Sequence, residues 1–314
     1  MHNFFESNDV EKVLDLTLSL ELCKEAFELQ SKGNVIQSLR DIIKAEDGRI
    51  LGTMPAYISE GRYKGFGLKS VLVDFKNTDI GKSHKGCILL YEENTNSAMS
   101  IVDAGIVTEL RTAAASAWAT HILAPPDASK LAILGTGVQA KRHFLAMLNI
   151  RKIKSMTVWS RNRESAEDFV KWCQEKSPIP MIIKSTPALA VIDADIICTV
   201  TASTSPFLYE SDLPIKCHIN AVGASAIGFQ EIDPNIYGSV DCYVDSREAS
   251  WGASQCLIKA RELGIIASKD KLKELGEATI ENSQNSHNRT LFKSVGLAVL
   301  DLVFAREVVY QHQK

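Results

Sequence analysis

The sequence has little net charge and no hydrophobic run long enough to cross a membrane. Its 35 Lys and Arg residues and 38 Asp and Glu residues give a net charge of −3 over 314 residues, so no strong field would recruit nucleic acid or an acidic membrane. No apolar run approaches the ~18 residues of a membrane span. The amino-terminal MHNFFESNDVEKV is acidic and lacks the apolar core of a signal peptide. We expect a cytoplasmic protein that binds neither nucleic acid nor membranes.

Patterns that would bind a metal or form disulfides are also missing. The seven cysteines are scattered, none forms C-x-x-C, and none has a spacing that suits zinc. No H-E-x-x-H motif or paired histidine spacing occurs. We therefore interpret the cysteines as reduced thiols in the core of a cytosolic protein, and we assign no metal site.

The pattern of apolar residues changes at an Ala-Pro-Pro-Asp break, residues 124–127, in a chain whose length suits two domains. Before the break, the spacing predicts a helix over 9–32, strands over 36–104 and an alanine-rich helix over 105–123. After it, strands alternate with helices, which is typical of a parallel sheet covered on both faces. The stretch 290–310 reads as one more helix, apolar nearly all round. The expected fold is α/β, a Rossmann-type doubly wound parallel sheet plus a second, α+β domain.

A glycine-rich turn follows the apolar strand LAIL. It reads G-T-G-V-Q-A from Gly135 to Ala140 and leads into a predicted helix. In a dinucleotide-binding turn, Gly135 permits the tight bend, Gly137 lets a pyrophosphate approach the backbone, and Ala140 lets the helix pack close to the sheet. Free N–H groups at the start of the helix would stabilise the phosphates. The alternative is a strand–helix turn without a ligand, but the strand, the helix and the next strand occur in the order that binding requires.

The end of the next strand indicates which nucleotide is bound. NAD-specific proteins usually place an acidic residue there to bind the ribose 2′-hydroxyl. Here the sequence is Trp159-Ser160-Arg161-Asn162-Arg163, which has no acid to repel a 2′-phosphate and two arginines that could pair with one. We expect NADPH to be preferred, with NADH as the other cofactor. The alternative is that these arginines are solvated loop charges.

The chain resembles the ornithine cyclodeaminase/mu-crystallin family over nearly its whole length. The matching stretches are MPAY (54–57), LK (68–69), SH (83–84), ELRTAAASAWAT (109–120), ILGTGVQA (133–140), HINAVGAS (218–225) and LFKSVG (291–296). The resemblance implies an NAD(P)-binding domain, placed at 124–283, and a substrate-binding and dimerisation domain built from both chain ends, 1–123 and 284–314. It also implies a homodimer, and hydride transfer between a nicotinamide and a carbon that bears an amine or imine next to a carboxylate.

One segment departs from the pattern that cyclodeaminases and related alanine dehydrogenases share, G-[AG]-D-x-P-G-K. Here Ser225 stands in place of the Asp that is thought to handle the amine, and Ile227 and Phe229 replace Pro and Lys. The Gly-Ala-Ser sequence is similar to mu-crystallin-like ketimine reductases. Ornithine cyclisation needs a base or anion, and a neutral serine is neither. A cyclic imine needs a carboxylate clamp, a hydride and a proton. We therefore expect reduction of Δ1-pyrroline-2-carboxylate or Δ1-piperideine-2-carboxylate to L-proline or L-pipecolate.

The resemblance suggests that three basic residues bind this imino acid. In relatives, an arginine in the region of Arg40 contacts the substrate carboxylate, and guanidinium suits that bidentate contact. Lys69 lies in a mostly apolar strand, where a buried lysine readily changes its pKa; we assign it carboxylate binding, with proton supply as a further role. The residue that matches Arg111 faces the substrate or the cofactor phosphates. Each residue also has a purely structural interpretation. Arg40 would be a surface arginine, Lys69 would lie exposed at a sheet edge, and Arg111 would form a salt bridge to Glu109 or Asp103.

Further residues are assigned by the same matches and by their place at the carboxyl ends of predicted parallel strands, where ligands bind in such sheets. Met54 joins the substrate residues, and the catalytic group is Lys69, His84 and Ser225, although a lone histidine is as often structural. The cofactor residues are Ser83, His84, Arg111, Thr112, Gly135, Gly137, Val138, Gln139, Ser160, Arg161, Asn162, Thr199, Val200, Thr201, Val222, Gly223 and Lys293.

Other functions stay open at this point. An alanine dehydrogenase would need a site that admits free ammonia, and an ornithine cyclodeaminase-like enzyme would need the missing Asp. A mu-crystallin-like, NADPH-dependent binding protein would have no need of an imino-acid clamp, and an opine-like or diamino-acid synthase would need room for two substrates. The size of the ring and the proton donor, whether water, Lys69 or His84, are also open.

Overall fold

The computed structural model describes residues 3–74, 84–91, 99–281 and 288–313. The chain forms two compact units, Met1–Arg111 with Leu297–Lys314, and Thr112–Gly296. The chain passes from the first unit to the second inside helix α3 (Ala104–Leu123). The first unit therefore combines two segments that are distant in sequence, and the second is one continuous segment between them.

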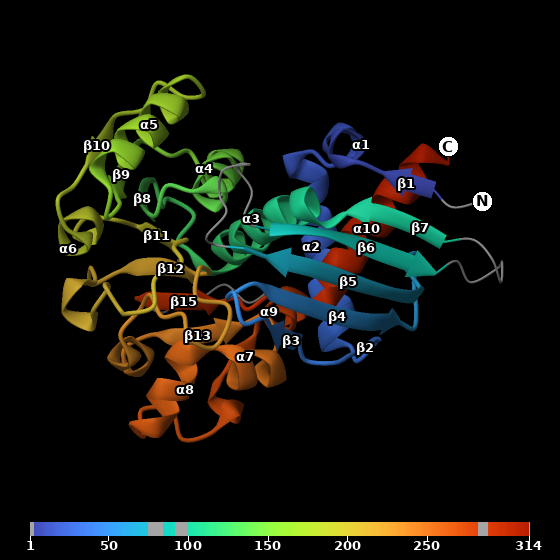
Figure 1. The fold of residues 1–314 in the computed structure, drawn as a ribbon. Helices are drawn as coiled ribbons and strands as arrows, with labels where there is room; N and C mark the ends of the chain where they lie inside the picture. The colour runs from blue at the N-terminus through green and yellow to red at the C-terminus, as the bar shows by residue number, and fades with distance from the viewer. Residues whose placement is uncertain (1–2, 75–83, 92–98, 282–287, 314) are drawn as a thin grey trace. The chain divides into compact units, whose positions relative to one another are not determined.

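The first unit contains a seven-stranded sheet in the order β1-β7-β6-β5-β4-β2, with β3 also paired to β4 (Figure 1). β1 and β7 pair in parallel, and the other neighbours are antiparallel. The strands are β1 Asn3–Phe5, β2 Val35–Gln37, β3 Asp41–Lys44, β4 Ile50–Ile58, β5 Gly65–Val73, β6 His84–Tyr91 and β7 Met99–Asp103. Three helices accompany them: α1 Ser7–Val13, α2 Leu16–Ser31 and α10 Ala298–His312.

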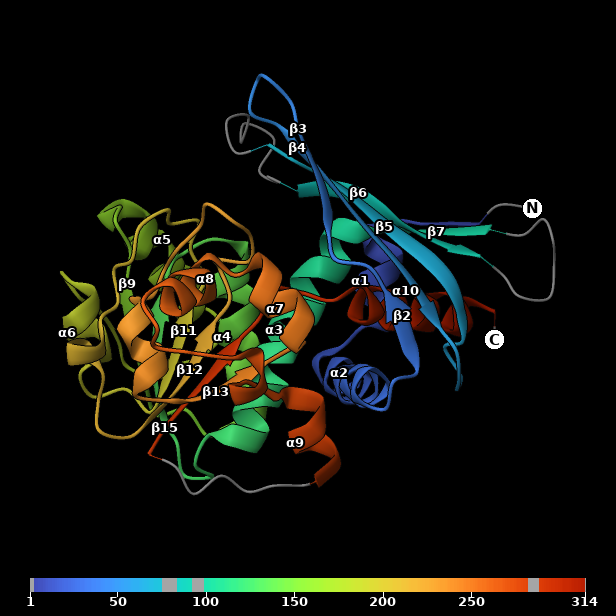
Figure 2. The ribbon, with the colours of Figure 1, turned by 90° about the horizontal axis from the view of Figure 1, so that it is seen from below.

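Helices α2 and α10 lie on the same side of this sheet (Figure 2). Side chains on alternate positions of a strand point to opposite faces, so Met54, Ala56 and Ile58 of β4 are buried while Pro55 is exposed. Helix α10 packs against α2, β4, β5 and β6, and every residue from 298 to 309 is buried. That burial includes three charged residues, Asp301, Arg306 and Glu307, each of which must have its charge compensated.

The second unit contains an eight-stranded, wholly parallel sheet in the order β10-β9-β8-β11-β12-β15-β13-β14. The strands are β8 Lys130–Leu134, β9 Ser155–Trp159, β10 Met181–Ile183, β11 Ile196–Thr199, β12 Cys217–Ala221, β13 Asp241–Val244, β14 Lys273–Glu274 and β15 Arg289–Lys293. The helices are α4 Val138–Ile150, α5 Arg163–Gln174, α6 Pro187–Val191, α7 Arg247–Ala253, α8 Gln255–Glu262 and α9 Leu275–Glu281. This architecture confirms the predicted Rossmann-type sheet with a second domain.

Two expectations from the sequence differ from the structure. The stretch 290–310 is not one helix, because residues 289–293 form β15 and only Ala298–His312 is helical. Strand β15 has only five residues, RTLFK, and so short a stretch cannot be distinguished by periodicity from the start of the helix that follows it. The units also divide at 111 and 296 rather than at 123 and 283, since β15 pairs with β12 and β13 and so belongs to the parallel sheet.

The long helix ends at Leu123, next to the Ala-Pro-Pro-Asp break, as expected. Strands β6 and β7 pair antiparallel, and residues 92–98 between them lie outside the described residues. None of the helices in the described part of the chain is long and apolar enough to span a bilayer.

Candidate functional site

The glycine turn between β8 and α4 leaves space above the first turn of the helix. Gly135 has φ = 118°, and a Cβ there would lie 2.8 Å from the Val200 carbonyl oxygen. Gly137 is the N-cap of α4, and nothing lies within 4 Å of the place where its Cβ would be. Ala140 is fully buried against the sheet. Gly135 is therefore needed for folding, and the open space at Gly137 fits a pyrophosphate on the exposed N–H groups of the helix.

The carboxyl ends of β11 and β12 lie beside this turn, since β8 pairs with β11 and β11 with β12. The backbone N–H groups of Val222 and Gly223 both donate to the Thr199 carbonyl oxygen at 3.1 Å. A Cβ at Gly223 would overlap the Thr201 carbonyl and the Glu231 carboxylate. The residues predicted to bind the cofactor at this edge, Thr199, Val200, Thr201, Val222 and Gly223, are thus brought together by the fold.

A buried acid that the sequence analysis missed organises this edge. Glu231 is 0% exposed. Its Oε1 accepts from the Thr201 backbone N–H at 2.6 Å and hydroxyl at 2.8 Å, and its Oε2 accepts from the Thr199 hydroxyl at 2.8 Å and the Ala224 N–H at 3.1 Å. Burial raises the pKa of Glu231, although the Lys293 charge and the Thr201 and Thr199 hydrogen bonds act in the opposite direction. The carboxylate holds the loop after β11 against the loop after β12.

Lys293, which was expected to contact the cofactor, lies within the protein at the end of β15. It is fully buried, and its Nζ donates to the carbonyl oxygens of Ala221 (3.1 Å) and Ala224 (2.6 Å). These two contacts support the end of β12, and the role of Lys293 toward the cofactor stays a prediction. Ser225 follows Ala224 at the same edge and is partly exposed.

The turn after β9 carries the residues expected to distinguish the two nucleotides. Arg161 is exposed. Asn162 is the N-cap of α5, and its side chain accepts from the Ser165 N–H at 3.0 Å. Arg163 forms an ion pair with Glu167 at 2.9 Å within α5. Of the two arginines, Arg161 is therefore the one placed at the turn itself, beside Ser160, which is partly exposed.

The first unit brings the predicted substrate residues together around a second missed acid, Asp301 of α10. Lys69 Nζ of β5 donates to Asp301 Oδ1 at 2.8 Å, and Arg111 Nε of α3 donates to the same oxygen at 3.1 Å. Lys69, Arg111 and Asp301 are 3%, 4% and 0% exposed. Met54 is the cross-strand neighbour of Lys69 on the same buried face. The signal that could have revealed Asp301 is an acidic residue in a stretch that is otherwise apolar all round.

The charges in this cluster shift the protonation of both partners. Burial lowers the pKa of Lys69 to about 7, with Asp301 opposing the shift and the cations Arg111 and Arg40 adding to it. Burial raises the pKa of Asp301, but the charges of Lys69 and Arg111 outweigh it and hold that pKa below its usual range. Because Arg40 acts on Lys69, all three predicted basic residues lie near one another. Two buried cations, Lys69 and Arg111, share one carboxylate, which leaves an excess of positive charge suited to an anion.

The other predicted residues lie on other parts of the described elements or outside the described residues. Ser83 lies outside the described residues, and His84 is described only by its backbone, which pairs with Val73 at the start of β6. Thr112 is buried in α3, Val138 is 42% exposed, and Gln139 lies in the first turn of α4. In the described ranges no group of three or more His, Cys, Asp or Glu side chains is arranged to hold a metal ion.

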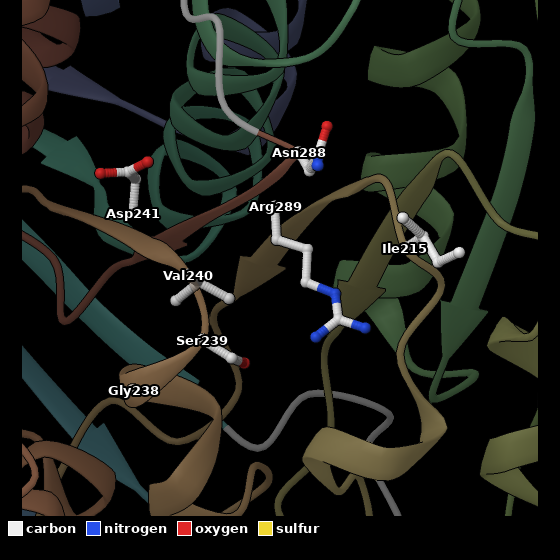
Figure 3. A pocket seen from close by; sticks show the side chains of 7 residues that line it. All are labelled: Ile215, Gly238, Ser239, Val240, Asp241, Asn288 and Arg289. Carbon is white, nitrogen blue, oxygen red and sulfur yellow. The ribbon is translucent and has the colours of Figure 1, made fainter.

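A pocket of about 470 Å³ lies at the amino ends of β12, β13 and β15 (Figure 3). Arg289 extends across it between Ile215 and Ser239, and its guanidinium donates to the carbonyl oxygens of Leu213 and Pro214. Ligands bind parallel α/β sheets at the carboxyl ends of the strands. This pocket is therefore at the wrong end of the sheet for the nucleotide.

A parallel sheet that carries a G-x-G-x-x-A turn at the carboxyl end of its first strand defines a nucleotide-binding protein of the Rossmann class. The sequence profile of the ornithine cyclodeaminase/mu-crystallin family matches residues 1–314. The chain belongs to this family.

Individual relatives agree over almost the whole chain. The ketimine reductase mu-crystallin of Macropus fuliginosus is 34% identical over 312 residues, which cover 97% of this chain and 96% of that protein. A structure of Thermococcus litoralis Δ1-pyrroline-2-carboxylate reductase with NADH and L-proline has a TM-score of 0.92 at 27% identity, covering 99% and 98% of the two chains. An archaeal alanine dehydrogenase dimer with bound NAD has a TM-score of 0.90 at 25% identity, covering 99% and 96%.

Alanine at two glycines of the nucleotide edge should separate nucleotide binding from folding. Gly137→Ala places a methyl group in open space, so the free energy of unfolding should change by less than about 1 kcal/mol, while the Kd for NADH or NADPH rises about tenfold or more because the pyrophosphate loses its close approach. Gly223→Ala must displace Thr201 and Glu231 and should cost about 2–3 kcal/mol of stability. Denaturant unfolding and nucleotide fluorescence titration measure the two effects. Unchanged affinity in Gly137→Ala would place the pyrophosphate elsewhere.

Proposed function

We propose that this protein reduces a cyclic ketimine carboxylate, Δ1-pyrroline-2-carboxylate or Δ1-piperideine-2-carboxylate, to L-proline or L-pipecolate with NADPH as the preferred reductant. The observation that carries the proposal is the buried cluster of Lys69, Arg111 and Asp301 with Arg40 beside it. Its surplus positive charge, in a protein that also carries a nucleotide-binding turn, suits a small substrate with a carboxylate.

The carboxylate of the substrate would bind to the guanidinium groups. Asp301 engages Arg111 through Nε, and the paired Nη groups of a guanidinium are the usual bidentate partners of a carboxylate. Arg40 is half-buried and lies beside Gly52 of β4, where its Cδ would be 3.6 Å from an added Cβ. Two guanidinium groups can thus hold the substrate carboxylate and fix the orientation of the adjacent imine carbon next to Lys69.

The nicotinamide, when bound, supplies the hydride for the imine carbon. The residues that would hold the nucleotide are Gly137 and the N–H groups at the start of α4, with Thr199, Thr201, Val222 and Gly223 at the neighbouring strand ends. Arg161 would pair with the 2′-phosphate of NADPH, which supports the preference for that nucleotide. His84 and Ser83 remain proposed neighbours of the nicotinamide from the family match alone.

The Ser225 position supports an imine substrate over an amino acid that must cyclise. A serine hydroxyl is neutral at physiological pH and supplies neither base nor anion for an amine. The named relatives include a ketimine reductase and a pyrroline-2-carboxylate reductase, which also supports this substrate class. The similar alanine dehydrogenase makes reductive amination of pyruvate the second candidate.

We further propose that the protein is a homodimer formed through the open face of the seven-stranded sheet. On the face opposite α10, one register row consists of Pro55, Leu68, Leu89, Ile101 and Phe4 from five adjacent strands. Phe4 and Phe66 are 68% and 59% exposed. A continuous apolar surface of this breadth is typical of an interface between subunits, and a second copy is the occupant that the dimeric relative supports.

The proposed activity predicts rapid oxidation of NADPH when the purified protein receives Δ1-pyrroline-2-carboxylate or Δ1-piperideine-2-carboxylate, each made in place from D-proline or D-pipecolate by an amino-acid oxidase. Arg111→Lys should raise KM for the imine about 100-fold because the bidentate contact is lost, whereas Arg62→Lys, at a half-exposed pair with Glu307, should leave KM unchanged. Absorbance at 340 nm follows both. If the protein turns over pyruvate and ammonium but neither imine, the proposal is wrong and the activity is that of an alanine dehydrogenase.

The role of Arg161 predicts a selective loss of NADPH affinity. Arg161→Ala should raise KM for NADPH about tenfold, which corresponds to about 1.4 kcal/mol, and leave KM for NADH unchanged because NADH has no 2′-phosphate. Arg163→Ala, which removes the partner of Glu167, is the matched control and should affect neither. An equal change for both nucleotides would show that Arg161 does not recognise the 2′-phosphate.

The dimer proposal predicts that the mass of the particle in solution falls when an apolar residue on the open face of the sheet is replaced by a charged one. Phe66→Asp should convert a particle of twice the chain mass into a monomer, since a buried carboxylate at an apolar interface is strongly unfavourable. Ile182→Asp, at a 54% exposed position on β10, is the control and should stay dimeric. Light scattering after size-exclusion chromatography gives both masses, and a dimeric Phe66→Asp protein would place the interface elsewhere.

A further inference from the structure

The hydrogen bonds of Lys69 direct its ammonium group. An ammonium has three N–H donors. One is donated to Asp301 Oδ1 at 2.8 Å and one to Thr108 Oγ1 at 2.6 Å. The Thr108 hydroxyl in turn donates to the Ala104 carbonyl oxygen at 2.5 Å, so it acts as an acceptor toward Lys69. Two of the three N–H groups are thus held by the protein, and no acceptor in the described part of the chain is seen for the third.

The groups that face Lys69 come from every element packed around it. Asp301 approaches from α10 and Arg111 from α3, and Arg40 acts from the segment before β3. On β4 and β6 its cross-strand neighbours are the apolar Met54 and Ile88. Among these neighbours Asp301 carries the negative charge. Its second oxygen, Oδ2, is buried and has no hydrogen-bond partner in the described part of the chain.

We propose that Asp301 is a positioning residue that makes Lys69 the proton donor of the reduction, by holding the ammonium with one N–H directed at the substrate nitrogen. The inference rests on the proposed function. In the step, the imine carbon gains a hydride from the reduced nicotinamide, which is oxidised. The C=N π bond breaks toward nitrogen, and the nitrogen takes a proton from Lys69 Nζ. Lys69 is left as a neutral amine and regains a proton from solvent.

The cluster must let Lys69 keep its proton near pH 7 and also let it give that proton to the substrate. An ammonium surrounded by Arg111, Arg40 and apolar side chains would lose its proton too readily to serve as an acid near pH 7. The Asp301 charge opposes this loss, and the pKa of Lys69 stays at about 7, where an acid can both transfer its proton and recover it. Arg111 shares the same Asp301 oxygen, so the carboxylate clamp and the proton donor are fixed relative to each other.

The first test is the pH profile of kcat/KM for the cyclic imine. The natural protein should lose activity as pH rises through about 7, because Lys69 must be protonated. Asp301→Asn removes the charge that retains the proton, so the falling limb should move at least one pH unit toward acid, and kcat/KM at pH 8 should fall at least about tenfold. Asp301→Glu keeps the negative charge, so the falling limb of its pH profile should lie close to that of the natural protein. Glu307→Gln, at another buried acid of α10, should leave the limb in place.

A second readout needs neither substrate nor cofactor. Cyanate carbamylates only neutral amines, so peptide mass spectrometry after brief exposure at pH 5 to 9 follows the titration of Lys69. Half-maximal modification should occur at least one pH unit lower in Asp301→Asn than in the natural protein. If the natural protein reduces no cyclic imine, the proposed function fails, and this titration still shows whether Asp301 controls Lys69.

Three outcomes would overturn the proposal. One is an unmoved falling limb in folded Asp301→Asn with a raised KM, which would mean that Asp301 serves only the Arg111 clamp. Another is an unshifted cyanate titration. If Asp301→Asn does not fold, Thr108→Val decides. This variant removes the second acceptor without a change of charge, so kcat should fall about tenfold while the falling limb of the pH profile stays nearly unmoved. An unchanged kcat in Thr108→Val is the third outcome that would contradict the positioning role.

Discussion

Two buried cations share one carboxylate oxygen, and the chemistry of the first unit depends on that arrangement. Without Asp301, Lys69 and Arg111 would be charged groups in a protein interior with no counter-charge, and breaking such a buried pair typically costs about 3–5 kcal/mol. With it, the cluster is stable but keeps a net positive charge. The same contact therefore keeps the helix α10 on its sheet and leaves the site ready for an anion.

The second unit uses a buried acid differently. Glu231 accepts four hydrogen bonds, two of them from backbone N–H groups, and so it fixes the backbone at the ends of β11 and β12. Lys293 supports the end of β12 through two carbonyl oxygens. Both are buried charged residues whose hydrogen bonds join them to the protein backbone and to neighbouring side chains. Their effect on a bound nucleotide would be exerted through Thr201 and Gly223, whose positions they determine.

Local features could be predicted from the sequence, and distant partnerships could not. The turn at Gly135 and Gly137 was recognisable because its strand, bend and helix are contiguous. Lys69 and Arg111 were identified by resemblance to relatives. Asp301 is 232 residues from Lys69 and 190 from Arg111, and Glu231 is about 30 from the threonines that it binds, so no local pattern joins them. The strand β15 was read as helix because its five residues are too few for a period to be recognised and an apolar helix follows closely.

The position of β15 also bears on how the chain acquires its structure during synthesis. β15 lies between β12 and β13 in the sheet, yet it follows β14 in the chain. While the ribosome makes residues 217–281, the two halves of the sheet have no strand to join them. The half that ends at β12 exposes an unpaired edge until residue 293 emerges, and such edges invite pairing with other chains. Completion of this sheet is therefore a late event, and a nascent chain that stalls before β15 is the form of this protein most exposed to aggregation.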